Sequence, residues 1–241
     1  MVRSPLRYNE TMDKKLVFSK ELAYILGLFI TALGVSFMEK PDFGVSMVVA
    51  PAYLIYRKLN PVLSFFTFGT AEYMLQLVLL LAMMFLLCKF RISWFFSFVT
   101  AVIYGFMLDG CMAFTATLAT DTMVQRLIMY TGGILLCCAG ISLVFHTYIP
   151  PEVYELFVKE VSKAFGVEIH TFKTYYDISS MLISVVLSFC FFGFGVFVGV
   201  REGTVICALI NGSIIKVFSR FFRMHLHFCA TFPKLEEFFT R

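Results

Sequence analysis

The feature that most constrains this chain is a series of long runs that carry almost no charge. Six such runs are separated by short charged or proline-containing stretches. They cover about residues 21–38, 65–88, 92–117, 126–149, 176–200 and 203–221. A bilayer core of about 30 Å requires roughly 20 apolar residues per helix, so each run predicts a membrane crossing. The last run is the weakest, because Lys216 and Arg220 lie in its second half.

The composition requires that lipid is the solvent of this chain. Of its 241 residues, 59% are hydrophobic and 15% are charged, against roughly 25% charged in soluble domains. Thirty phenylalanines are more apolar surface than a soluble fold of this size could bury. The first run follows a polar tail and has no small-residue cleavage site, so we interpret it as a membrane helix rather than a signal peptide. We expect an all-α membrane protein without a separate soluble domain.

The distribution of Lys and Arg predicts the orientation, because these residues accumulate in cytoplasmic loops. With both termini in the cytoplasm, the inner side carries 15 of the 20 basic residues. The inner set is Arg3, Arg7, Lys14, Lys15, Lys20, Lys89, Arg91, Lys159, Lys163, Lys173, Lys216, Arg220, Arg223, Lys234 and Arg241, and the outer set is Lys40, Arg57, Lys58, Arg126 and Arg201. The net charge of +4 then reflects anchoring at the inner leaflet, and nucleic acid is not an expected partner.

The two halves of the chain resemble each other. The segment "GVSF" at 34–37 matches "GISL" at 140–143, an offset of 106 residues. In each half a proline-containing turn and a short helical piece follow, and then a full crossing that begins with a carboxylate. These carboxylates are Glu72 and Asp177, at an offset of 105, and each half closes with a Gly-containing segment. Chance similarity between apolar helices is the alternative explanation.

Each half contains three crossings, so the second half must enter the membrane from the opposite side. Such inverted repeats are typical of transporters whose site lies near the bilayer midplane. The expected fold is therefore six transmembrane helices as two inverted three-helix repeats, each with a short re-entrant or interfacial helix. The predicted organisation is a cytoplasmic tail over 1–20, repeat 1 over 21–120, repeat 2 over 121–222 and a cytoplasmic tail over 223–241.

The two short helical pieces differ in character. Residues 150–166 have an apolar stripe at helical spacing and a charged opposite face, which predicts an amphipathic helix lying in the cytoplasmic interface. Residues 44–56 carry no charge at all. This piece either dips into the protein as a re-entrant segment or only packs against lipid.

Several motifs together suggest a family. The stretches "LGVSFMEKPDFGVS", "AVIYGFMLDG", "YIPPEVYEL" and "REGTVICALINGSIIKVF" resemble the YitT/YczE group of bacterial integral membrane proteins, over roughly residues 20–220. The resemblance implies two copies of a Gly-rich helix and turn, and a location in the bacterial inner membrane. It implies little biochemistry. The chain departs from the pattern at both turns, where Met47, Val49 and Val153 replace expected Pro or Asp residues, so no role of those turn carboxylates carries over.

Glu72 is the strongest candidate for a functional residue. A charged side chain near the bilayer centre costs about 2.5–3.5 kcal/mol on insertion scales, so it normally faces the bundle interior. It would contact substrate or a coupling cation, or carry a proton. The alternative is an interfacial Glu72 on a helix that begins later than residue 65. Gln76 lies one turn further on the same face and could bind the carboxylate or a ligand.

Three further residues are candidates. Asp109 lies in the third crossing, just before Gly110. Asp177 either joins the site or, in the first turn of a helix from about Thr174, complements the helix dipole. Asn211 either interrupts the sixth helix or belongs to a packing face of small residues. The glycines at 193, 195 and 199 are interpreted as close-packing positions. Tyrosines also provide hydroxyl groups that could line a polar site: Tyr53, Tyr56, Tyr73, Tyr104, Tyr130, Tyr175 and Tyr176.

The sequence contains no CxxC, Walker, GxSxG or HExxH motif, so no enzymatic activity, cofactor or metal is expected. The stretch "HLHFC" near the C-terminus could touch a metal, but a basic interfacial tail is the favoured interpretation. The preferred function is transport or binding of a small cationic, zwitterionic or neutral polar molecule, because three carboxylates disfavour an anion. An ion gradient or a separate ATPase would supply the energy. The alternative is a membrane adaptor or regulator that binds a protein partner or forms a homo-oligomer.

Overall fold

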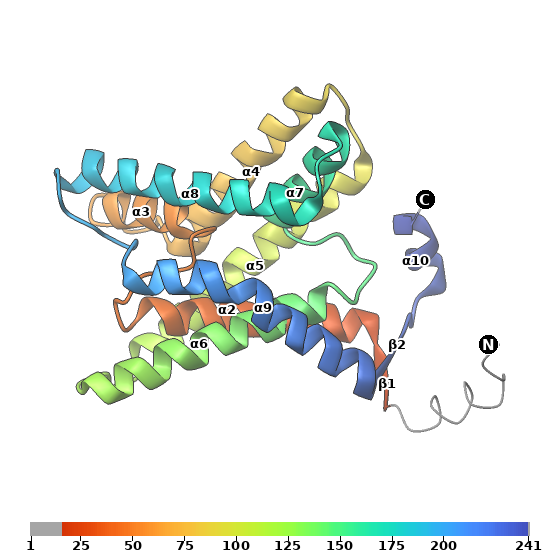
Figure 1. Cartoon of the computed structure of the whole chain (residues 1–241), viewed down its shortest axis with the longest axis horizontal. Coiled ribbons are helices and arrows are strands. Elements are labelled where there is room, and N and C mark those ends of the chain that lie inside the picture. Colours follow the sequence, from red (N-terminus) through yellow and green to blue (C-terminus); the bar gives the residue numbers. More distant parts are fainter. Residues whose placement is uncertain (1–15, 241) are drawn as a thin grey trace.

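The computed structural model describes residues 16–240, so the predicted N-terminal tail lies outside the described residues over 1–15. Within the described range, six helices are long and apolar enough to span a bilayer, as predicted. They are α2 (Lys20–Glu39), α4 (Phe68–Leu87), α5 (Ile92–Ala116), α6 (Met123–Val144), α8 (Ile169–Phe192) and α9 (Glu202–His225) (Figure 1). The chain is therefore a multi-pass α-helical membrane protein.

The remaining elements are short: α3 (Ala50–Leu59), α7 (Val153–Phe165), α10 (Pro233–Thr240), β1 (Leu16–Ser19) and β2 (Leu226–Cys229). Pro51 lies in the first turn of α3, where a missing N–H costs nothing, and Arg57 and Lys58 close its last turn. The two strands pair in parallel, with Leu16 opposite Leu226. This small sheet, which the sequence did not predict, joins the start of α2 to the end of α9.

Helix α8 covers 169–192 rather than the predicted 176–200, and glycine geometry explains where it ends. The helix stops at Gly193, which has φ +103°, and Gly195 follows with φ +84°. These backbone angles favour glycine and cannot continue a helix. A Cβ atom on either residue would meet nothing within 4 Å, so their predicted role in close packing is wrong. Gly199 does approach a neighbour, because a Cβ there would lie 2.6 Å from the ring of Tyr53.

The centre of the molecule is an antiparallel pair of helices, α2 and α6, which make the most extensive contact in the fold. Gly27 lies against the backbone of Gly140, and Gly34 against that of Gly133. A Cβ atom on Gly34 would lie 2.5 Å from the backbone nitrogen of Cys137, so only glycine permits this approach. Small residues at such contacts let two membrane helices pack backbone to backbone.

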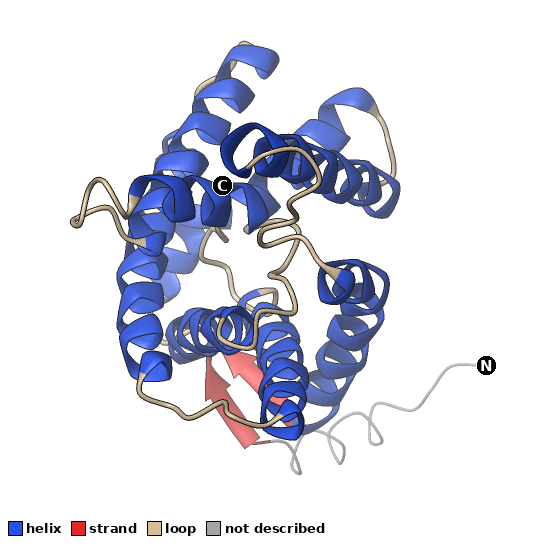
Figure 2. Ribbon diagram, turned by 90° about the vertical axis from the view of Figure 1, so that its left-hand side faces the viewer, coloured by secondary structure: helices blue, strands red, loops and turns tan. Residues whose placement is uncertain are grey.

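The other helices are arranged around this pair. Helix α5 packs on α2, and α9 packs on α6. Helix α3 contacts both α4 and α8, while α7 contacts both α8 and α4 and also touches α5. Figure 2 shows the loops that connect these helices running between them. The two short helices therefore lie between the long helices of the two halves.

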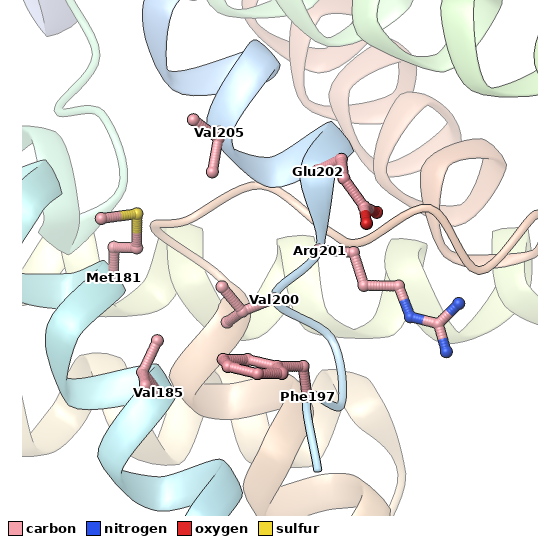
Figure 3. Close-up of a pocket in the computed structure, with 7 residues that line it drawn as sticks. All are labelled: Met181, Val185, Phe197, Val200, Arg201, Glu202 and Val205. Carbon is pink, nitrogen blue, oxygen red and sulfur yellow. The ribbon is translucent and has the colours of Figure 1, made fainter. Parts of the chain in front are cut away.

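One pair of neighbours along the chain packs tightly and the corresponding pair does not. Helices α4 and α5 cross where Gly69 meets the backbone of Gly105. Helices α8 and α9 barely touch. Between them lies a cavity of about 560 Å³ with mostly apolar walls (Figure 3). It is lined by Met181, Val185, Phe197, Val200, Arg201, Glu202 and Val205.

Candidate functional site

Glu72 lies fully inside the protein, with 0% of its surface exposed. Helix α4 begins at Phe68. Thr67 is its N-cap, and the Thr67 hydroxyl accepts a hydrogen bond from the backbone N–H of Thr70. The helix starts later than the sequence suggested, but Glu72 is nevertheless interior. Its Oε2 atom accepts a hydrogen bond of 2.7 Å from the hydroxyl of Tyr154 on α7. Its Oε1 atom has no hydrogen-bond partner among residues 16–240, which is costly for a buried polar atom.

Gln76 joins α4 to the beginning of α7. The side chain is 0% exposed, and its Oε1 atom accepts a hydrogen bond of 3.0 Å from the backbone N–H of Val153. Its Nε2 atom donates to Oε2 of Glu152 at 3.0 Å. The first backbone N–H groups of a helix have no partner within that helix. Gln76 accepts from one of them, the N–H of Val153 at the start of α7, which burial would otherwise leave unpaired. These contacts fix the start of α7 against α4.

Glu152 and Tyr154 complete the arrangement, which we call the buried carboxyl cluster: Glu72, Gln76, Glu152 and Tyr154. Burial raises the pKa of Glu152 to about 8, partly opposed by its hydrogen bond from Gln76. Glu152 therefore carries a proton at neutral pH. Burial and the nearby Glu72 raise the pKa of Tyr154 well above its usual value, so the phenol remains a donor.

A polar layer from α2 and α5 borders the cluster. The Tyr24 and Thr100 hydroxyls lie 2.5 Å apart, and Thr100 donates to the Pro150 carbonyl at 3.2 Å. Tyr104 is 1% exposed and interacts electrostatically with Glu152. Tyr104 was among the tyrosines that the sequence proposed for a polar site. Within residues 16–240, no group of three or more His, Cys, Asp or Glu side chains could hold a metal ion.

Asp109 does not belong to this cluster, because its carboxylate is hydrogen-bonded to the start of α4. Its Oδ2 atom accepts a hydrogen bond of 2.6 Å from the Thr67 hydroxyl, and its Oδ1 atom accepts one of 2.8 Å from the Gly69 N–H. The carboxylate therefore lies at the N-terminus of α4, where negative charge is favourable. In this structure Asp109 ties α5 to the first turn of α4.

Asp177 forms an ion pair on α8. Lys173, one turn earlier, lies 3.6 Å from Oδ1 of Asp177 and 3.4 Å from Oε1 of Glu155 on α7. Because α8 begins at Ile169, Asp177 lies in its third turn, and the predicted capping role in a first turn is wrong. Asp177 does not contact Glu72 directly, but its neighbour Tyr176 interacts electrostatically with both, and Glu155 interacts with both Asp177 and Glu152.

Asn211 does not interrupt its helix, since α9 runs continuously from Glu202 to His225. A Cβ atom on the adjacent Gly212 would meet nothing within 4 Å, so the predicted small-residue packing face is also wrong there. The Asn211 side chain instead lies toward α6, where its Oδ1 atom is 3.5 Å from Sγ of Cys138. Asn211 therefore belongs to the α6–α9 contact and not to the cluster.

Sequence reasoning found Glu72 and Gln76 but missed their partners. It placed Glu152 on the charged face of an interfacial helix and did not single out Tyr154. A signal was present, because Glu152 follows two prolines and directly precedes a helix, which is an N-cap position. Nothing in the linear pattern indicated that this cap packs inside the protein, against Gln76, which lies 76 positions earlier in the chain.

Comparison with known proteins identifies a family without assigning it an activity. A family described as being of unknown function, DUF6198, matches residues 18–220, which is most of the chain. No curated protein and no solved structure matches this sequence. The matched region contains all six long helices except the last residues of α9, and all of the buried carboxyl cluster. The protein is thus a member of the DUF6198 family, a family of unknown function.

Proposed function

We propose that this protein binds a small cationic, zwitterionic or neutral polar molecule at the buried carboxyl cluster and carries it across the membrane. The observation that carries the proposal is Glu72, a fully buried carboxyl whose Oε1 atom has no hydrogen-bond partner among the described residues. A second carboxyl, Glu152, lies within electrostatic range. Keeping such groups inside a membrane domain is expensive, and they usually mark a ligand or ion pathway.

The location of the cluster supports a site deep in the membrane. Glu72 and Gln76 are the fifth and ninth of twenty residues in α4, about 6 Å and 12 Å from the start of that helix at 1.5 Å per residue. The cluster therefore extends from Glu72 toward the middle of a bilayer crossing, which Gln76 approaches. The beginning of α7 meets Gln76 there, so in this proposal α7 is a re-entrant helix whose N-terminus reaches the site. The charge-free α3 would be its counterpart in the first half.

The central helix pair supports two inverted repeats. At an offset of 106 residues, Gly27 corresponds to Gly133 and Gly34 to Gly140. The observed contacts are Gly27 with Gly140 and Gly34 with Gly133. Each contact is therefore the symmetry mate of the other, as a two-fold axis between α2 and α6 requires. We propose that the repeats rock about this axis to expose the site to each side in turn.

The short helices follow the same two-fold relation. Helix α3 of the first half packs on α8 of the second, and α7 of the second half packs on α4 of the first. Each short helix is thus positioned to transmit motion between the repeats. A YitT/YczE-like origin, a bacterial inner membrane and cytoplasmic termini belong to this proposal, as does an ion gradient or a separate ATPase as the source of energy.

The adaptor alternative is less well supported. It places Glu72 at the membrane interface and leaves the centre of the protein without a polar site. The full burial of Glu72 and Gln76, and the hydrogen bonds that hold α7 against them, favour a ligand site.

A thermal-shift survey of small metabolites on the purified protein tests the proposal. A ligand of the site should raise the unfolding temperature of the wild type, and its affinity should fall at least tenfold in Glu72→Gln and Gln76→Leu. Asp121→Asn, which alters an exposed loop carboxylate, is the matched control and should bind like the wild type. Unchanged binding and uptake in both cluster variants would overturn the proposal.

A further inference from the structure

We infer that the ligand of the buried carboxyl cluster is a small monovalent cation, and that it enters in exchange for one of the two protons held by Glu72 and Glu152. This inference rests on the proposed function and names its substrate class and coupling. It follows from three properties of the cluster: the absence of a neutralising cation among residues 16–240, the closure of the site, and the small number of oxygen atoms left for a ligand.

The first property is the missing positive charge. The titratable side chains that interact with the two carboxyls are Tyr24 from α2, Tyr104 from α5, Cys137 from α6, Tyr154 and Glu155 from α7, and Tyr176 from α8. None of these side chains is a cation, and the ion pairs of Lys173 on α8 are with Glu155 and Asp177. Gln76 and the tyrosines provide hydrogen bonds but no charge.

The second property is closure. Glu72 and Gln76 are 0% exposed, Tyr104 and Tyr154 are 1% and 4% exposed, and Glu152 is half-buried beside them. An ionised Glu72 without a cation beside it would cost several kcal/mol in such an interior, and a second negative charge on Glu152 would raise that cost. The closed site must therefore be close to neutral. When the site holds no other ligand, protons bound to the carboxyls neutralise it, in agreement with the pKa of about 8 for Glu152.

The exchange follows from the same requirement. When a monovalent cation binds between the carboxyls, one proton must leave if the site is to close again with the same charge. The proton passes from a carboxyl oxygen to water on the side to which the site is open. No covalent bond other than that O–H bond changes. The charge of the bound cation replaces the charge of the released proton, so the net charge of the site stays the same.

The third property limits the cation. Oε2 of Glu72, Oε2 of Glu152 and Oε1 of Gln76 already accept hydrogen bonds, while Oε1 of Glu72 is free of one within the described chain. Ca²⁺ requires six to eight oxygen ligands and Mg²⁺ requires six in near-ideal octahedral geometry, which the remaining oxygens do not supply. A small protonated amine needs only one acceptor for each N–H, and any monovalent cation matches the charge of the one proton that it replaces.

Infrared difference spectroscopy tests whether the site holds an exchangeable proton. The protein in lipid should show a protonated-carboxyl C=O band at pH 6 that decreases when NaCl, KCl or methylammonium chloride is added. N-methylglucamine chloride, which is too bulky for the site, serves as the ionic-strength control. The decrease should be absent in Glu72→Gln and Glu152→Gln and present in Asp121→Asn. A band that responds equally in all four proteins would overturn the inference.

Proton release gives the stoichiometry. In weakly buffered solution with a pH-indicating dye, each bound cation should release about one proton. Raising the pH removes the competing proton, so the apparent Kd should fall about tenfold per pH unit up to about pH 8 and then become constant, since Glu152 is deprotonated above its pKa of about 8. Gel filtration first establishes that each variant is folded, and Glu152→Gln carries the test if Glu72→Gln aggregates.

The failures of the two proposals can be told apart. A neutral or zwitterionic metabolite that binds through Glu72 without proton release leaves the proposed function standing and overturns the cation exchange. A cation that binds with the same Kd at pH 6 and pH 8 would likewise overturn the exchange for a proton and leave the proposed function standing. If no cation and no metabolite binds the wild type, both proposals are wrong.

Discussion

The helix pair α4–α5 and the pair α8–α9 occupy corresponding places in the two halves of the chain, yet they pack differently. In the first pair, Gly69 lies against the backbone of Gly105, and Asp109 is hydrogen-bonded to the first turn of α4. In the second pair the helices barely touch, and the cavity of about 560 Å³ separates them.

The difference shows that close helix packing requires a small residue on both partners. At an offset of 107 residues, Gly105 corresponds to Gly212, which is still glycine but has no neighbour within 4 Å. At an offset of 105, Gly69 corresponds to Thr174. With a side chain on one of the two helices the backbones cannot meet, so a single glycine on the other does not restore the contact. In its helix packing the first half of the chain is therefore the rigid half and the second half the open one.

The largest expected effect comes from filling the tight crossing. Gly69→Leu would place a side chain where even a Cβ atom collides with the carbonyl oxygen of Gly105. Overpacking of this kind costs about 1–3 kcal/mol, occasionally more, so we expect a large loss of folded protein and of thermal stability in detergent. Gly212→Leu, at the open position, is the control and should remain within about 1 kcal/mol of the wild type. Equal losses in the two variants would show that the halves pack alike.

An intermediate effect is expected at the hydrogen bonds that tie α5 to α4. Asp109→Ala removes the acceptor of both the Gly69 N–H and the Thr67 hydroxyl, and should lower the free energy of unfolding by about 0.5–2 kcal/mol. Lys216→Ala, at the corresponding position of α9, should change it by less than about 0.5 kcal/mol. Chemical denaturation in mixed micelles measures both. If Lys216→Ala were the more damaging change, the assignment of rigid and open halves would be reversed.

The smallest effect is expected at Asp177, the counterpart of Glu72 in the second half. Its ion pair with Lys173 is partly exposed, so Asp177→Asn should change stability by about 0–1 kcal/mol. Ligand affinity should also stay within about threefold of the wild type, whereas Glu72→Gln loses at least tenfold. Isothermal titration with a ligand from the thermal-shift survey measures the two variants. A loss in Asp177→Asn as large as that in Glu72→Gln would show that both repeats contribute equally to the site.

Sequence patterns were sufficient for the long helices, because a bilayer demands some 20 apolar residues per crossing whatever the neighbours are. They were also sufficient to single out Glu72 and Gln76, since polar groups in such a segment need an internal partner. Patterns failed where backbone geometry decides the outcome. Gly193 was interpreted as a packing residue within a helix, but its φ of +103° ends that helix. At the other end α8 begins at Ile169 rather than near Thr174, which places Asp177 in the third turn and not in the first.

The sequence by itself therefore determined that this is a membrane protein with six long apolar helices, and it indicated Glu72 and Gln76 on the second crossing as candidate site residues. Only the tertiary structure decided which groups meet there. Glu152 and Tyr154 reach Glu72 and Gln76 because α7 packs along α4, and that packing depends on surfaces some 80 residues apart in the chain. An amphipathic helix has the same pattern whether its apolar face covers lipid or protein. The distinction lies in what packs against that face, and a linear sequence does not record it.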